Sequence, residues 1–168
     1  MRYNFGHLRR EGFLTGLEQA GLHHDPNLTC DQAMSVREGA SATRRLLAMD
    51  APPTAIVFAT DVAAMGAYGV AADLGLTIGQ DLSIIGYDGL PEGQLAVPRL
   101  TTFGVDSRGA GERLASLLIR RMRGGEPEEL RELQDARLLE GRSDGPPKRS
   151  STALAQHLRQ GPMQRTGQ

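Results

Sequence analysis

The sequence predicts an α/β fold, a parallel sheet flanked by helices, and three observations support this. Residues 54–59 and 82–88 are short apolar runs rich in β-branched side chains, which is typical of strands buried on both faces. Segments with helical spacing of apolar residues lie before, between and after these runs. Strand and helix therefore alternate along the chain, as they do in parallel sheets with right-handed connections.

The first third of the chain is predicted to be mostly helical. In residues 7–20 the apolar side chains recur at three- and four-residue steps, and Gly21 ends the helix. A second helix is predicted at residues 39–49, and it ends before Pro52 because proline disfavours helical backbone in the residue before it. The first strand, residues 54–59, follows directly.

The middle of the chain is predicted to continue the alternation. Residues 61–74 are rich in alanine and form a helix that ends at Gly75. The second strand, residues 82–88, leads through a loop rich in glycine and proline to a third strand at residues 100–103. These elements make up the core of the predicted sheet.

The last third is predicted to contain a long amphipathic helix at residues 107–123 and a final strand at 137–140. Beyond Arg142 the sequence is polar and shows no lasting apolar stripe. We therefore predict one domain over residues 1–147 and a disordered tail over 148–168.

Composition excludes several classes of protein. The 168 residues hold 19 Lys and Arg against 20 Asp and Glu, and this balance argues against a chain that coats nucleic acid. A single cysteine cannot form an internal disulfide, and no apolar run reaches the roughly 20 residues of a membrane span. We expect a cytoplasmic protein that does not bind membranes.

Three motifs that resemble catalytic or metal-binding sites lack the context that such sites need. Residues 141–145 match the G-x-S-x-G nucleophile elbow, but Pro146 prevents the helix that must follow it. Residues 109–111 give only an isolated G-x-G, which is weak evidence for a dinucleotide site. The histidines do not have metal-ligand spacing. We predict no enzyme activity, no catalytic residue, no metal and no cofactor.

Polar residues follow both buried strands, where parallel sheets bind their ligands. Asp61 follows the first strand and is also a favourable N-cap for the helix after it, which is the stronger interpretation from local pattern. Asp88 follows the second strand, and for it a turn and a ligand contact are equally favoured. If the first helix packs beside this edge, Arg9 faces the same hollow as both carboxylates. An arginine and a carboxylate suit a polyhydroxylated ligand.

Four blocks of the sequence resemble the effector-binding domain of LacI/GalR-family transcriptional regulators. They are PTAIVFATDVAAMGA at 53–67, GL at 75–76, DLSIIGYD at 81–88 and PRLTT at 98–102. R-x-x-G-F at Arg9 and the segment ending in R-S-D-G-P at Pro146 extend the similarity.

The resemblance implies a periplasmic-binding-protein-like type I lobe whose N-terminal partner lobe is largely missing. It implies that Arg9 and Asp88 hold a sugar-like effector, and that Thr60 lies at the edge of the pocket. Met34 stands where the family commonly has an aromatic residue that stacks on the ligand. Together with Asp61, these are the predicted ligand-binding residues.

The resemblance also implies partners. Full-length relatives form homodimers, and the corresponding contacts here are predicted at Ala67, Val70, Leu74 and Leu95. DNA binding is expected only through a helix-turn-helix headpiece, which this chain lacks. The alternative to a transcriptional regulator is a solute-binding protein of a sugar transport system, because that class of protein shares the fold.

Overall fold

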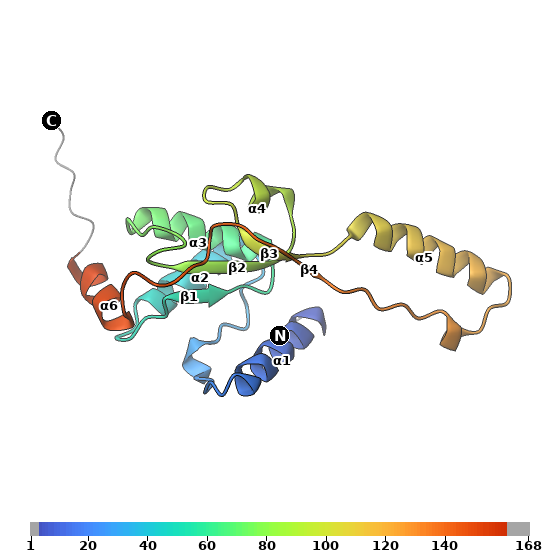
Figure 1. Ribbon diagram of the computed structural model, residues 1–168, viewed down its shortest axis with the longest axis horizontal. Helices are drawn as coiled ribbons and strands as arrows, with labels where there is room; N and C mark the ends of the chain where they lie inside the picture. The colour runs from blue at the N-terminus through green and yellow to red at the C-terminus, as the bar shows by residue number, and fades with distance from the viewer. Residues whose placement is uncertain (1–3, 161–168) are drawn as a thin grey trace.

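A computed structural model describes residues 4–160 of the chain, and it has helices and strands in the alternating order that the sequence predicts (Figure 1). The helices are α1 (Asn4–Gln19), α2 (Val36–Leu47), α3 (Asp61–Asp73), α4 (Pro91–Leu95), α5 (Ser107–Met122) and α6 (Ser151–Gln160), with 3-10 helices η1 (Pro26–Leu28) and η2 (Pro127–Glu129). The strands are β1 (Ala55–Val57), β2 (Ser83–Asp88), β3 (Thr101–Gly104) and β4 (Arg137–Leu139).

The sheet is mixed rather than wholly parallel. Its strand order is β1-β2-β3-β4, with β1, β2 and β3 parallel and β4 antiparallel to β3. The register aligns Ile56 with Ile84, and Tyr87 with Phe103. The predicted parallel sheet is thus confirmed for the three strands joined by helical or loop connections, and the final strand returns along the outer edge.

The core lies where α2 and α3 pack against each other and against the sheet. Helix α2 begins with a capping box in which Ser35 and Glu38 bond each other's backbone amides. The two helices approach closely at glycines: a Cβ on Gly39 would lie 2.0 Å from the carbonyl oxygen of Ala63, and one on Gly66 would lie 2.1 Å from that of Val36. Only glycine allows backbones to come this near.

The predicted dimer contacts are partly wrong, because α3 faces the core. Ala67 and Val70 are fully buried within the chain and cannot meet a partner. Leu74 is partly buried against the same core, and Leu95 in α4 is 83% exposed. Only these last two present apolar surface to solvent.

The prediction of a disordered tail is also wrong for the described part of residues 148–168. Residues Ser151–Gln160 form α6, in which Leu154 is fully buried in the core. The Ser151 hydroxyl donates to the Pro52 carbonyl, and Arg149 pairs with buried Asp81. Buried Leu154 and Ala155, together with these polar contacts, hold α6 against the core although its composition predicted disorder. Residues 161–168 lie outside the described part.

Helix α5 and the segment after it project away from the body of the molecule (Figure 1). None of its residues is buried, and Leu114, Leu118 and Met122 are mainly exposed. The sequence predicted its amphipathic character, and the structure shows that much of its apolar face is exposed. No described helix is long and apolar enough to cross a membrane.

Candidate functional site

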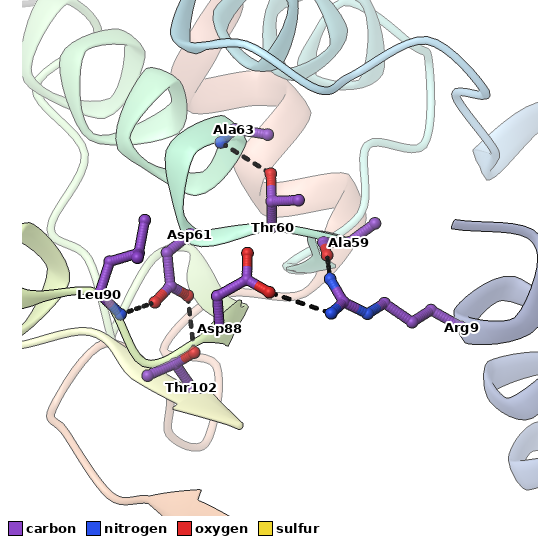
Figure 2. A network of polar contacts seen from close by, with 8 residues as sticks. All are labelled: Arg9, Ala59, Thr60, Asp61, Ala63, Asp88, Leu90 and Thr102. Carbon is purple, nitrogen blue, oxygen red and sulfur yellow. Dashed lines mark hydrogen bonds and ion pairs between the residues drawn. The ribbon is translucent and has the colours of Figure 1, made fainter. Parts of the chain in front are cut away.

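Arg9 and Asp88 form an ion pair between α1 and the end of β2. The Arg9 Nη2 donates to Asp88 Oδ1 at 3.0 Å, and Nη1 donates to the Ala59 carbonyl at 2.5 Å (Figure 2). The Arg9 guanidinium also stacks on Tyr87, 3.7 Å from the ring centroid, and lies 4.9 Å from that of Phe5. The structure thus brings Arg9 and Asp88 into direct contact.

Asp88 is held in an unusual environment. Its φ of 122° is rare for a residue with a side chain, and such strain is common at binding sites. Burial raises the pKa of Asp88 above its ordinary value, and Arg9 offsets only part of this rise. Donated hydrogen bonds would stabilise this partly desolvated carboxylate, so the site can accept hydrogen bonds from a ligand.

A cavity of about 620 Å³ lies beside this pair, between α1, residues 28–34 and β1. Met34 lines it, as the resemblance implied, and so do Tyr87 and Phe103, which stack with ring centroids 6.0 Å apart. Arg9 lies at the end next to Asp88, while most of the remaining lining is apolar. The cavity is therefore polar beside Arg9 and apolar over most of its lining.

Thr60 and Asp61 face away from this cavity, and the structure corrects both interpretations of Asp61. The N-cap of α3 is Thr60, whose hydroxyl accepts from the Ala63 amide at 3.3 Å. Asp61 is the first helical residue and is only 1% exposed. Figure 2 shows its carboxylate turned toward Leu90 and Thr102 rather than toward Arg9.

Both oxygens of Asp61 are used inside the protein. The Leu90 amide donates to Oδ2 at 2.7 Å, and the Thr102 hydroxyl donates to Oδ1 at 2.6 Å. A Cβ on Gly86 would lie 2.1 Å from the same carboxylate, so β2 needs glycine there. Asp61 thus ties the loop after β2 to β3, and neither oxygen is free for a ligand.

The predicted ligand-binding residues did not include Tyr87, near the end of the second strand, or Phe103. The apolar run predicted a strand buried on both faces, whereas one face of β2 and β3 is open beside α1. The register that pairs Tyr87 with Phe103 was the signal that could have found them. No three His, Cys, Asp or Glu side chains within residues 4–160 are grouped to hold a metal ion.

Comparison with known proteins identifies the family. Residues 2–143 match the periplasmic binding protein-like domain. The HTH-type transcriptional repressor PurR of Pasteurella multocida is 33% identical over 114 residues, which are 68% of this chain and 34% of that protein.

Solved structures agree with this match. A regulatory protein of the LacI family from Chloroflexus aggregans has a TM-score of 0.75 and 32% identity, covering 82% of this chain and 50% of its own. A LacI family regulator from Enterococcus faecium, solved with bound ribose, has a TM-score of 0.70 and 29% identity, covering 84% and 52%. The chain spans about a third to a half of the length of these relatives. It belongs to the LacI family of transcriptional regulators, through the periplasmic binding protein-like domain of that family.

Proposed function

We propose that this chain is the ligand-sensing part of a transcriptional regulator and that it has no enzyme activity. The observation that carries the proposal is the Arg9–Asp88 pair at the carboxyl end of the parallel strands, beside a cavity. A carboxylate and a guanidinium held in fixed geometry can accept from and donate to the hydroxyl groups of one small molecule. The effector is a small polar, sugar-like compound.

Ribose is the first compound to test, because a LacI family relative was solved with ribose bound. Arg9 and Asp88 already bond each other, so a bound sugar would insert its hydroxyls beside the pair and use the remaining lone pairs of Asp88. Met34 and Tyr87 supply apolar surface for the ring carbons. Binding would shift the protein toward the conformation that the sugar prefers.

Regulation would act through a partner unit that binds DNA, as the helix-turn-helix type of the relatives suggests. Ligand binding and DNA affinity are then coupled and reciprocal. We expect this regulation to take place in the cytoplasm. Exposed Leu95, with Val97 at 91% exposure beside it and partly buried Leu74, is the proposed contact for a homodimer.

Isothermal titration calorimetry of the full chain with D-ribose and related pentoses and hexoses tests the effector site. We expect saturable heat from at least one sugar, and its loss in Asp88→Ala. Asp73→Ala is the matched control, because the Asp73 carboxylate is exposed and pairs with Arg44 on the far ends of α2 and α3. Full affinity in Asp88→Ala would remove this residue from the site and refute the proposal.

A further inference from the structure

The chain contains two Asp-Gly sequences, at residues 88–89 and 144–145. Aspartate followed by glycine is prone to backbone rearrangement, because glycine has no side chain to shield its amide nitrogen. That nitrogen can attack the carboxyl carbon of the aspartate side chain when no hydrogen bond holds the amide in place. The hydrogen bonds of the two glycine amides therefore indicate which pair can react.

The two glycine amides are held differently. The Gly145 amide donates to the Ser83 hydroxyl at 3.1 Å, and the Asp144 carboxylate accepts from the Thr101 hydroxyl at 2.5 Å. Within residues 4–160 no group accepts a hydrogen bond from the Gly89 amide, which lies just beyond the end of β2. The nitrogen of the first pair is thus available, whereas that of the second pair is held.

The backbone at Asp88 and Gly89 also favours rearrangement. Asp88 has a φ of 122° and Gly89 a φ of 74°, so two successive residues lie in the region that favours glycine. This conformation is strained for Asp88, because it carries a side chain. Rearrangement adds a methylene group to the main chain and removes that constraint. Both residues are only half-buried, so water can reach them.

We propose that residues 88–89 are a modification site, at which Asp88 rearranges spontaneously to isoaspartate. The Gly89 nitrogen attacks Cγ of the protonated Asp88 carboxyl, so that a C–N bond forms and the C–OH bond breaks. One water leaves with the carboxyl hydroxyl and the amide proton, and a succinimide ring remains. Water then opens the ring: attack at the Cγ carbonyl restores aspartate, and attack at the main-chain carbonyl of Asp88 gives isoaspartate.

The surroundings of Asp88 support the neutral carboxyl that this reaction needs. Burial raises the pKa of Asp88, and the negative charge of Asp61 raises it further. The Arg9 guanidinium, which donates to Oδ1 at 3.0 Å, offsets only part of this rise. Arg9 therefore slows the reaction without preventing it.

The product would lose the contact between Arg9 and Asp88. In isoaspartate the main chain runs through Cγ, and the free carboxylate is attached directly to Cα. The carboxylate is then displaced from the position in which it meets Arg9 Nη2. Rearrangement would thus inactivate the effector site, a consequence that rests on the proposed function, whereas the reaction itself does not.

Peptide mapping of the full chain after prolonged incubation in neutral buffer tests the proposal. Electron-transfer dissociation gives backbone fragments specific to isoaspartate, so both Asp-Gly pairs are quantified in one sample. In the folded chain we expect about fivefold or more isoaspartate at residue 88 relative to residue 144. In urea, where neither amide is held, we expect similar amounts at both. No isoaspartate at residue 88 in the folded chain, or equal amounts at the two residues, would overturn the proposal.

Ser83→Ala tests the role of the amide hydrogen bond. It frees the Gly145 amide, so isoaspartate at residue 144 should rise about threefold or more, while the amount at residue 88 stays the same. Ser151→Ala is the matched control, because its hydroxyl donates to the Pro52 carbonyl and to neither Asp-Gly pair. It should change neither amount.

An unchanged amount at residue 144 in Ser83→Ala, with circular dichroism showing a folded chain, would overturn the role given to the free Gly89 amide. If Ser83→Ala does not fold, the comparison of the two pairs in the unaltered chain decides. None of these measurements uses a sugar, so their failure is distinguishable from failure of the effector proposal.

Discussion

Arg9 and Asp88 are 79 positions apart in the sequence, and their side chains meet at 3.0 Å. The same guanidinium bonds the Ala59 carbonyl and stacks on Tyr87. Apart from these contacts α1 is held loosely, because Gly6 is its only buried residue among those described. Arg9 is therefore both a candidate ligand contact and the main attachment of α1 to the sheet.

Arg9→Ala is expected to lower the free energy of unfolding by about 1–3 kcal/mol, because one partly buried ion pair, one hydrogen bond and one cation–π contact are lost together. Arg9→Lys keeps the charge but not the forked geometry of the guanidinium. It should therefore lower the free energy of unfolding by less than Arg9→Ala does. Urea unfolding followed by circular dichroism measures both.

The matched control for this prediction is Arg108→Ala. Arg108 is 92% exposed and pairs only with Glu112 one helical turn away, so its loss should cost under about 0.5 kcal/mol. Equal destabilisation by the two alanine variants would show that α1 does not depend on Arg9.

The site was only partly predictable from sequence, and the reason is physical. The family pattern placed Arg9 and Met34 at one cavity and Asp88 next to Arg9, since that pattern encodes how α1 meets the sheet. Asp61 was misassigned because a carboxylate at the start of a helix looks the same whether it caps the helix or bonds a distant strand. The bond to Thr102 depends on register across 41 residues, which no local pattern contains.

The fold was predicted more fully than the packing. Strands and helices depend on the local spacing of apolar residues. Most were predicted within a few residues of their observed bounds. Packing between distant segments was not predictable from local patterns: α6 docks through Leu154 against a core formed by residues 46–100. Burial of Ala67 and Val70 likewise follows from the glycine crossing of α2 and α3, not from their own chemistry.

Asp61→Ala is expected to destabilise the protein by on the order of 3 kcal/mol, because it leaves the Leu90 amide and the Thr102 hydroxyl without their acceptor. Thr102→Val should cost less, since it removes one donor and leaves the other bond intact. Thermal and urea unfolding of both variants test the order. A larger loss in Thr102→Val would show that Asp61 does not organise this junction.

Gly66→Ala and Gly69→Ala should change stability in opposite directions although both lie in α3. A Cβ at Gly66 would meet the backbone of α2 at 2.1 Å, so α2 must shift, and a loss of at least about 2 kcal/mol is expected. A Cβ at Gly69 meets nothing within 4 Å, and alanine there should stabilise the helix by about 0.5–1 kcal/mol. Similar unfolding midpoints for the two variants would contradict the close crossing of α2 and α3.

Tyr68 should cause the free energy of unfolding to fall as the pH rises above 10. Burial raises its pKa to about 12, and its hydroxyl donates to the Pro98 carbonyl at 2.8 Å. Between pH 10 and 12 the unfolded chain releases this proton while the folded chain keeps it, so stability falls as the pH rises.

Tyr68→Phe tests this pH dependence. It should lose about 1 kcal/mol at neutral pH with the hydrogen bond, and its stability should fall less between pH 10 and 12. Urea unfolding at a series of pH values gives both quantities. An unchanged alkaline slope in the variant would show that another group is responsible.

Helix α5 should exchange its amide hydrogens far faster than α3. All of its residues are at least partly exposed, and it projects from the body of the molecule (Figure 1). Few contacts outside the helix protect it, and most helical stability in proteins comes from tertiary packing. In α3, by contrast, Ala67 and Val70 open only with the core. Hydrogen-exchange mass spectrometry of the full chain compares the two helices directly. Equal protection would mean that the apolar face of α5, with Leu114 and Leu118, is covered in solution, and lowering the protein concentration would then show whether a second copy covers it.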